Sequence, residues 1–346
     1  MACAGDRIVG GLPAGWRTPP FIRWLSTAAR VPSMIQLGQY APPTHTIAHL
    51  SDTHYLGGKR ALYGKLDTDR TLARALEQLE RSGTKPSAIV ITGDLADLGE
   101  PDAYQRLRSE LQPVADRMGS KIIWVMGNHD ERGPFASALF GDEPDGPAAD
   151  APQDRVYDID GLRIIALDSS VPGYHHGELT DEQLSWLEEV LAVPAAHGTL
   201  LALHHPPLPS PIEIMAIIEL QDQQKLADVI RGTDVRGILA GHLHYSTHGT
   251  FAGVPVSVAS ATCYTIDTSA PQDTLLGVDG GQSINLVNLY TDNVVHSIVP
   301  IGDFTQVAGF SGVFLDKLAS MTPDERREAF SSKTSAFSVA EVESST

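Results

Sequence analysis

The sequence predicts an α/β fold in which two sheets pack together with helices on their outer faces. From residue 46 onward, short apolar runs that read as buried strands alternate with amphipathic helices. After residue 245 several strands follow one another with no helix between them, which is not the pattern of a simple doubly wound sheet. The 346 residues are 42% hydrophobic and 20% charged, a composition that suits one large domain with a sizeable core.

Eleven segments are predicted to be strands from their length and their β-branched and aliphatic content. Asp160-Gly161, which separates two of them, is a strong hairpin-turn signal. The segments are residues 46–50, 88–92, 122–126, 155–159, 162–167, 200–203, 237–240, 247–251, 254–258, 284–289 and 294–299.

Four amphipathic segments are predicted to be helices. The first, residues 67–81, has Asp67 or Thr68 as its N-cap, an apolar face that includes Leu72, and Gly83 after its end. The others are residues 101–118, 181–191 and 222–231. Residues 322–325 (Thr-Pro-Asp-Glu) resemble a capping box with proline at the first helical position, so a short helix is expected near the C-terminus.

The chain is expected to divide into an N-terminal extension over residues 1–40, a folded domain over residues 45–300 and a C-terminal tail over residues 301–346. The extension is rich in Pro, Gly and Arg and carries one acid, Asp6. It reads either as a targeting or anchoring segment or as an unstructured extension translated from upstream of a start at Met34. The second interpretation is favoured because the segment is short and lacks strong periodicity.

The formal net charge of −18 argues against a nucleic-acid polymer as substrate and against docking on anionic lipid, because both are bound through an excess of Lys and Arg. A small phosphate-bearing substrate stays compatible with this charge, since bound cations reverse the field locally. The two cysteines imply no disulfide framework, and no apolar run reaches the length of a membrane span. The first residues lack the apolar core of a secretory signal, so we expect a cytoplasmic location.

Seven potential metal ligands stand directly after five of the predicted strands. In open sheets the ligand crevice lies beyond the carboxyl ends of the strands, so these side chains should meet in one crevice. They are Asp52, His54, Asp94, Asn128, His204, His242 and His244. The pattern predicts a metal site, and the number of ligands favours a site for two ions.

Asp94 is the natural bridge between two ions, because it is the central lone carboxylate after a strand and a dinuclear site needs a bridging carboxylate. Asp52 and His54 can both reach one ion where the chain turns over it. Imidazoles together with carboxylates suit iron, manganese, zinc or cobalt better than magnesium or calcium. Two divalent ions outweigh the charges of two aspartates, so the site would attract phosphate even on an acidic protein.

Each of these motifs alone has a more ordinary explanation. His204 by itself reads as a core histidine whose hydrogen bonds are satisfied, and Asp94 reads as a turn former. All five motifs occur together, in this order and each at a strand end. Their combination favours the metal site over the structural explanation.

The motifs resemble those of the calcineurin-like metallophosphoesterase superfamily. Residues 93–101, 204–207, 241–245 and 257–264 resemble more specifically the class III cyclic nucleotide phosphodiesterases of bacteria. The resemblance extends over about residues 46–300. The motifs that carry it are Asp52-x-His54, Gly93-Asp94-x-x-Asp97, Gly127-Asn128-His129-Asp130, His204 and Gly241-His242-x-His244.

The resemblance implies a four-layer αββα sandwich and a single catalytic domain with two metal ions. It implies an iron-type ion held by Asp52, His54, Asp94 and His244. It implies a manganese-type ion held by Asp94, Asn128, His204 and His242, with zinc or cobalt as alternatives.

The resemblance also implies the reaction. A hydroxide that bridges the ions would attack phosphorus in line and open a 3′,5′-cyclic nucleotide, with cyclic AMP as the expected substrate and 5′-AMP as product. His129 resembles the general acid that protonates the departing 3′ oxygen, and Asp97 would pair with His129 and hold its orientation. Relatives of this kind suggest a homodimer.

Two alternative functions differ from this one. A broad-specificity phosphodiesterase or metallophosphatase acting on linear or 2′,3′-cyclic diesters would use the same metal pair. Ser/Thr protein phosphatases carry an Arg shortly after the Gly-Asp motif, and Asp97-Leu98-Gly99 lacks it here, which favours diesters over monoesters. A non-catalytic scaffold would be expected to have lost ligands, whereas every ligand is present.

Several neighbouring residues have open assignments. His205 either supports a ligand, contacts substrate or is a structural loop histidine, and residues 174–177 (Tyr-His-His-Gly) form either a pocket wall or a solvated loop. Asp130 and Tyr245 are candidates for holding the ligands from behind. Asp168 follows a strand, but the two metal sites are complete without it.

Overall fold

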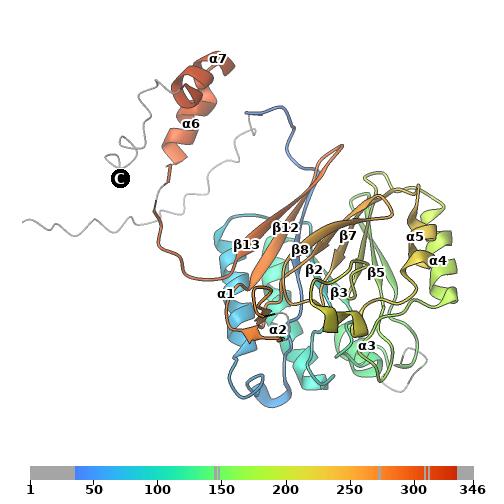
Figure 1. Cartoon of the computed structure of the whole chain (residues 1–346). Coiled ribbons are helices and arrows are strands. Elements are labelled where there is room, and N and C mark those ends of the chain that lie inside the picture. Colours follow the sequence, from blue (N-terminus) through green and yellow to red (C-terminus); the bar gives the residue numbers. More distant parts are fainter. Residues whose placement is uncertain are drawn as a thin grey trace, which may run out of the picture.

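The computed structural model describes residues 36–143, 146, 149–271, 274–307, 309, 310 and 312–332. Most of the expected N-terminal extension, residues 1–35, and the last residues of the tail therefore lie outside the described part of the chain. The rest forms two sheets and the helices that cover them (Figure 1).

The first sheet has the strand order β13-β12-β1-β2-β3. Its centre is parallel: β1 (His45–Leu50) pairs with β2 (Ala88–Thr92), and β2 pairs with β3 (Lys121–Val125). On the other side of β1, the antiparallel strands β12 (Ser283–Leu289) and β13 (Val294–Pro300) complete the sheet. The central strands are buried on both faces, which explains their continuous apolar sequences.

The second sheet has the strand order β4-β5-β6-β7-β9-β8. Four parallel strands lie in its centre: β5 (Leu162–Leu167), β6 (Thr199–Leu203), β7 (Val235–Ala240) and β9 (Val254–Val258). Antiparallel strands close both edges, β4 (Arg155–Ile159) beside β5 and β8 (Thr247–Phe251) beside β9. The predicted hairpin at Asp160-Gly161 joins β4 to β5.

The two sheets pack face to face, and alternate residues of each strand point to different cores. Ile47 and Val90 point into the apolar layer between the sheets, where Ile164 and Leu239 meet them from the second sheet. Leu50 and its neighbours point outward to α1 (Thr68–Arg81), α2 (Pro101–Met118) and α3 (Arg132–Phe140). The second sheet is covered on its outer face by α4 (Asp181–Leu191) and α5 (Gln223–Ile230).

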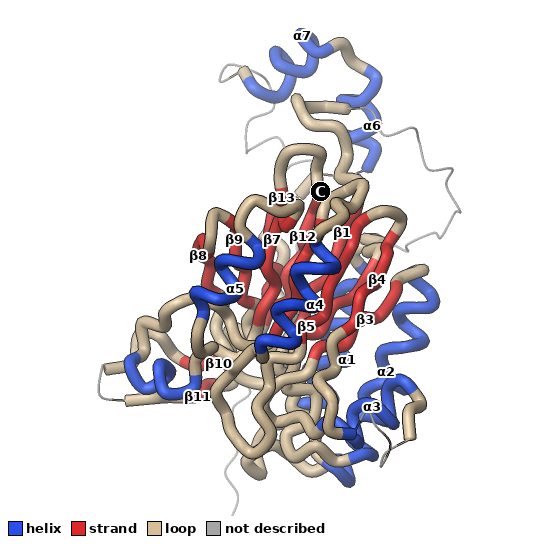
Figure 2. Tube along the Cα trace, turned by 90° about the vertical axis from the view of Figure 1, so that its right-hand side faces the viewer, coloured by secondary structure: helices blue, strands red, loops and turns tan. Residues whose placement is uncertain are grey.

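The layers follow the order helix, sheet, sheet, helix. Figure 1 shows α1 and α2 on the left, the strands in the centre and α4 and α5 on the right, and Figure 2 shows α4 and α5 in front of the strands. The predicted αββα sandwich is therefore confirmed. The helix ends are those that the sequence signals: Asp67 caps α1, and Thr180 with Gln183 forms a capping box at α4.

Some elements escaped prediction because they lack a periodic signal. Helix α3 carries Gly133 and Pro134 in its first turn and buries apolar side chains without a polar face, so it gives no amphipathic pattern. The segment η3 (Glu213–Ile218) and the two-residue strands β10 (Thr265–Ile266) and β11 (Gly277–Val278) are short. The three-residue η1 (Gly57–Lys59) is shorter than any periodic pattern can reveal.

The C-terminal segment stands apart from the sandwich in both views (Figures 1 and 2). It contains α6 (Gly312–Ser320), which was not predicted, then α7 (Pro323–Arg326) and η4 (Arg327–Ser331). The capping box predicted at Thr322 and Glu325 is present at the start of α7. Across the described residues, every helix is too short or too polar to cross a membrane.

Candidate metal centre

The seven predicted ligands all follow the carboxyl ends of strands, and five of them have an unusual backbone conformation. Asp52 (φ 53°), His54 (φ 45°), Asp94 (φ 50°), His242 (φ 71°) and His244 (φ 58°) lie in the left-handed region. Side chains other than glycine enter this region at a cost, and such residues gather at functional sites. The backbone at these five residues therefore adopts a conformation of higher free energy that directs their side chains into the site.

Four ligands form the first cluster. Potential ligand atoms of Asp52, His54, Asp94 and His244 all lie within 4.8 Å of one another, and all four residues are buried. His54 Nε2 is 3.2 Å from His244 Nε2 and 3.5 Å from Asp94 Oδ2. His244 Nε2 is also 3.4 Å from Asp52 Oδ1. This is the set predicted for the first ion.

The second cluster is built around His204 Nε2. This atom lies 3.1 Å from Asn128 Oδ1, 3.2 Å from His242 Nδ1 and 3.3 Å from Asp94 Oδ2. Asp94 Oδ2 therefore contacts a histidine nitrogen of each cluster, His54 on one side and His204 on the other. A carboxylate oxygen shared in this way is the arrangement that a bridging ligand requires.

Each of the four histidines is oriented by an acceptor on its outer nitrogen. His54 Nδ1 is 2.8 Å from Asp97 Oδ1, and His204 Nδ1 is 2.7 Å from the carbonyl oxygen of Thr92. The outer nitrogens of His242 and His244 contact main-chain carbonyls as well, at distances of 2.8 and 3.1 Å. Histidines that ligate metals are held in this way, with the outer nitrogen donating and the inner lone pair free for the ion.

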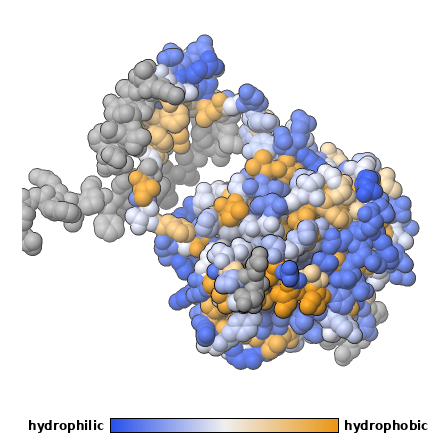
Figure 3. All heavy atoms as spheres, in the orientation of Figure 1, coloured by the Kyte–Doolittle hydropathy of each residue, from blue (hydrophilic) through white to orange (hydrophobic). Residues whose placement is uncertain are grey.

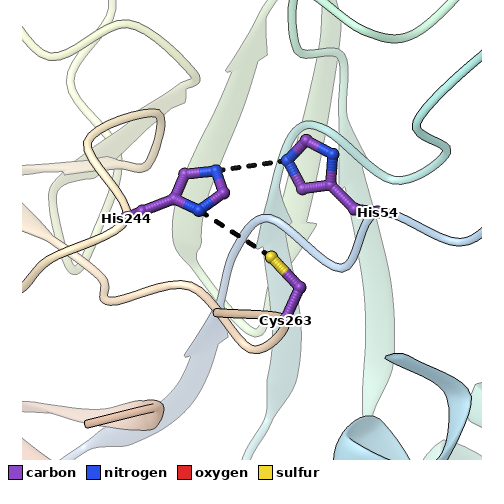
Figure 4. A group of neighbouring side chains, drawn as sticks. All are labelled: His54, His244 and Cys263. Atoms are coloured by element: carbon purple, nitrogen blue, oxygen red, sulfur yellow. Dashed lines mark hydrogen bonds between the residues drawn. The ribbon is translucent and has the colours of Figure 1, made fainter. Parts of the chain in front are cut away.

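The inner nitrogens then face each other in pairs, as Figure 4 shows for His54 and His244. Two lone pairs only 3.2 Å apart repel unless a cation lies between them. The same figure shows Cys263, whose thiol lies 3.8 Å from the outer nitrogen of His244 and packs against it from behind. The donor set of imidazoles, carboxylates and an amide oxygen therefore fits a pair of transition-metal ions.

The pKa values of the ligands show the same need for cations. Burial and the charge of His204 lower the pKa of His242 to about 3, whereas burial of His204 is outweighed by Asp94, which raises its pKa to about 9. In the other pair, burial and the charge of His54 hold the pKa of His244 well below its usual value. The hydrogen bond to Asp97 and the charge of Asp94 raise the pKa of His54 despite its burial. Each facing pair thus combines one histidine whose pKa is raised with one whose pKa is lowered.

Asp130 holds the loops that carry Asp94 and Asn128. Its carboxylate accepts hydrogen bonds from the main-chain amides of Leu95, Ala96 and Gly127 at 2.9–3.1 Å, and Tyr104 Oη donates to it at 3.0 Å. The supporting role expected of Asp130 is therefore visible in its contacts. Gly127 is required at its position because a Cβ there would lie 2.2 Å from the amide nitrogen of Asp94.

His129 lies beside the first cluster, with its ring centroid 4.8 Å from that of His54 and with 30% of its side chain exposed. Its Nδ1 is 2.9 Å from the main-chain carbonyl oxygen of Asp97 and 3.7 Å from Asp97 Oδ1. Asp97 therefore contacts His129 mainly through its backbone. The nearer partner of the Asp97 carboxylate is His54, which the sequence did not suggest.

The loop at residues 174–177 reaches the centre through His175, a contact that fits the pocket-wall interpretation of this loop. His175 Nδ1 lies 2.9 Å from the side-chain amide nitrogen (Nδ2) of Asn128, and the ring centroid of His175 lies 5.1 Å from that of His129. The solvated-loop interpretation is therefore incomplete, since this exposed loop also touches a ligand. The run of two histidines was the signal in the sequence.

Among the other residues with open assignments, His205 contacts a proposed ligand. His205 is buried, with its ring centroid 4.5 Å from that of His242 and its Nδ1 2.8 Å from Ser169 Oγ, which favours a supporting role over substrate contact. Tyr245 pairs with Ser210. Asp168 forms an ion pair of 3.0 Å with Arg132.

The chain is similar to known phosphoesterases in both sequence and fold. The profile of the calcineurin-like phosphoesterase family matches residues 45–246. The chain is 53% identical over 276 residues to a cAMP/cGMP dual specificity phosphodiesterase of Mycobacterium tuberculosis, covering 80% of this chain and 86% of that protein. It is 52% identical to a probable cyclic nucleotide phosphodiesterase of Rhodococcus erythropolis, covering 78% of this chain and 87% of that protein.

More distant proteins share the fold or part of the sequence. A glycerophosphodiester phosphodiesterase of Enterobacter lignolyticus is 30% identical, covering 64% of this chain and 78% of that protein. Among solved structures, a dimetal phosphatase from Danio rerio superposes with a TM-score of 0.53 at 16% identity, over 75% of this chain and 98% of that one. At this identity the superposition supports the fold only.

Proposed function

Because this chain belongs to the calcineurin-like phosphoesterase family, we propose that it is a phosphoesterase that hydrolyses 3′,5′-cyclic nucleotides, with cyclic AMP as the expected substrate. The observation that carries the two-metal part of the proposal is the position of Asp94 Oδ2 between the inner nitrogens of His54 and His204. The names of the relatives from M. tuberculosis and R. erythropolis support the choice of substrate.

Two ligand sets are proposed from these contacts. Asp52, His54, Asp94 and His244 would hold an iron-type ion, and Asp94, Asn128, His204 and His242 a manganese-type ion. Zinc and cobalt suit the same donors. When bound, such a pair supplies a nucleophile from water at neutral pH and offsets negative charge on the phosphoryl oxygens.

The residues around the ions would divide the remaining work. The carbonyl oxygen of Asp97 accepts a hydrogen bond from His129 Nδ1–H. In its protonated form His129 carries a second proton on Nε2, and this proton would pass to the departing 3′ oxygen as the bond between phosphorus and that oxygen breaks. The Asp97 carboxylate orients His54, and His175 orients the side chain of Asn128. The reaction consumes one water and yields a 5′-nucleotide.

A broader diesterase is the second candidate, because the glycerophosphodiester phosphodiesterase of E. lignolyticus is also related. The same metal pair would then act on linear or 2′,3′-cyclic diesters. A non-catalytic scaffold is disfavoured because all seven predicted ligands converge.

The proposal extends to the organisation of the protein. The catalytic domain would span residues 45–300, and the tail from residue 301 would lie outside the reaction. We also propose that the enzyme is cytoplasmic and forms a homodimer. Light scattering of the purified chain tests the dimer, since a monomeric mass would contradict it.

The function is tested with protein reconstituted with iron, manganese, zinc or cobalt. The values of kcat/KM for cyclic AMP, 2′,3′-cyclic AMP, a glycerophosphodiester and a phosphomonoester are compared in the wild type, in His242→Ala and in His248→Ala. His248 is an exposed histidine of β8 and provides the matched control. We expect the wild type and His248→Ala to have their highest kcat/KM with cyclic AMP. We expect His242→Ala to lose this activity. Equal or better turnover of the linear diester would favour the broader enzyme.

A further inference from the structure

We propose that the cavity between Tyr63 and the β10–β11 hairpin binds the base of the nucleotide, an inference that rests on the cyclic nucleotide function proposed above. The cavity has a volume of about 610 Å³. Its apolar lining comes from two segments far apart in the sequence. The lining residues that matter for the argument are Tyr63, Leu66, Tyr264, Ile266, Leu275 and Val278.

The cavity and the metal centre share a wall. The ring centroid of Tyr264 lies 4.4 Å from that of the proposed ligand His244, and the carbonyl oxygen of Tyr264 lies 3.1 Å from His244 Nδ1. One side of this residue therefore borders the ligands and the other borders the cavity. We therefore expect the nucleoside of a phosphodiester held at the ions to extend past His244 toward this cavity.

The lining has the chemistry that a nucleobase needs. A base offers flat faces that stack on aromatic rings and an edge of donors and acceptors. Tyr63 is 66% exposed. Its ring centroid lies 5.6 Å from that of Tyr264, with an angle of 67° between the ring planes, so both rings can contact a planar ligand. Lys65 and Asp279, also at the cavity, can meet the polar edge of a base.

Some apolar groups of this cavity are open to solvent. Leu275 and Val278 are 46% and 40% exposed, and neither belongs to a core cluster. Apolar surface also interrupts the polar surface of the domain in Figure 3. Exposed apolar surface that lines a cavity next to a catalytic centre is typical of a ligand site.

Tyr63 is held in a strained conformation that presents its ring. Its φ of 53° lies in the left-handed region, where a tyrosine costs free energy that a glycine or asparagine would not. On the other side of the cavity, β11 packs against Tyr264 so closely that a Cβ at Gly277 would lie 2.9 Å from the ring. The backbone at Tyr63 and the packing of β11 on Tyr264 thus place the two rings on facing sides of the cavity.

Two other cavities suit a base less well. One of about 380 Å³ borders Asn128, but it is lined by polar and small residues such as Glu131, Arg132 and Asp150, with no aromatic ring among its described lining. Another of about 700 Å³ lies between α1 and α2, is lined mainly by charged side chains of both signs and has no aromatic ring among its described lining. Stacking therefore favours the cavity at Tyr63.

The test compares cyclic AMP with ribose 3′,5′-cyclic phosphate, which keeps the reacting group and lacks the base. Tyr63→Asn is the main variant because asparagine tolerates the left-handed backbone, and Tyr63→Phe retains the ring. Tyr40→Asn is the matched control, since Tyr40 is similarly exposed but packs on Tyr290. We expect Tyr63→Asn to raise KM for cyclic AMP about tenfold with kcat retained.

Tyr63→Asn should have the same KM as the wild type for the substrate without a base. Tyr63→Phe and Tyr40→Asn should have the same KM as the wild type for cyclic AMP. A second variant, Leu275→Asp, should repeat the effect of Tyr63→Asn from the opposite wall. Unchanged KM for cyclic AMP in both cavity variants, or an equal rise for both substrates, would overturn the base site while leaving the proposed function in place. Failure of the wild type to hydrolyse cyclic AMP would instead overturn the proposed function and the base site with it.

Discussion

Asp97→Asn separates two roles that one carboxylate could have at this centre. The Asp97 carboxylate accepts from His54 Nδ1 at 2.8 Å, with 15% of the Asp97 side chain and 2% of the His54 side chain exposed. A buried hydrogen bond to a charged group contributes about 1.5–3 kcal/mol, which corresponds to roughly 10- to 100-fold in metal affinity. Losses of this size are typical when the outer partner of a metal-ligating histidine is removed.

The expected result is therefore weaker binding of the first ion with little change in the acid step. The main-chain carbonyl that holds His129 stays in place in Asp97→Asn, since it does not depend on the side chain. Metal affinity is measured by competition with a chromophoric chelator, and the rate is measured at saturating metal. His129→Ala should behave in the opposite way, with normal metal affinity and a rate that recovers on esters with good leaving groups.

The reasoning would be refuted by a different pattern. If Asp97→Asn bound both ions normally and lost activity only with poor leaving groups, the Asp97 carboxylate would act through His129, as the family resemblance implied. A double variant adds a further check. If Asp97 acts through His54, the free-energy effects of Asp97→Asn and His129→Ala should add in the double variant, because one acts on metal binding and the other on proton transfer.

Three further predictions concern the surroundings of the centre. Gly127→Ala should abolish metal binding and lower the melting temperature, because its Cβ would lie 2.2 Å from the Asp94 amide; calorimetry and metal titration check this. His175→Ala should weaken the second ion about tenfold by freeing the amide of Asn128, as read by the metal dependence of kcat. Burial raises the pKa of Asp154 to about 6, so the wild type should lose stability relative to Asp154→Asn as pH rises from the ordinary pKa of 3.8 to about 6; denaturant unfolding across this range that shows no change would contradict it.

The ligands could be predicted from the sequence because two physical signals coincide at each of them. An apolar run identifies a parallel strand, and the residue that follows must lie at the carboxyl edge of the sheet. Asp94 and His204 are placed by this rule without knowledge of side-chain rotamers. The partners of their outer atoms are not, since the carbonyl of Thr92 carries no residue-specific signal.

The remaining features depended on tertiary contacts. Whether the Asp97 carboxylate turns toward His54 or His129 is a matter of one side-chain rotation, and both histidines are within reach. His175 sits on an irregular loop whose path no periodic pattern describes. Helix α3 was missed because the fold buries it on several sides, so its sequence resembles a loop with glycine and proline more than an amphipathic helix.

The left-handed backbone of five ligand residues has a consequence for engineering the protein. Each such residue other than glycine costs on the order of 1–2 kcal/mol. A screen for thermal stability without metal would therefore select glycine or asparagine at these positions. Such variants would be more stable but would lack the metal centre. Lys59 and Ala252 have the same backbone conformation away from the ligands, at φ 56° and 51°. Glycine at those two positions should raise the tolerance to heat and leave the metal chemistry untouched.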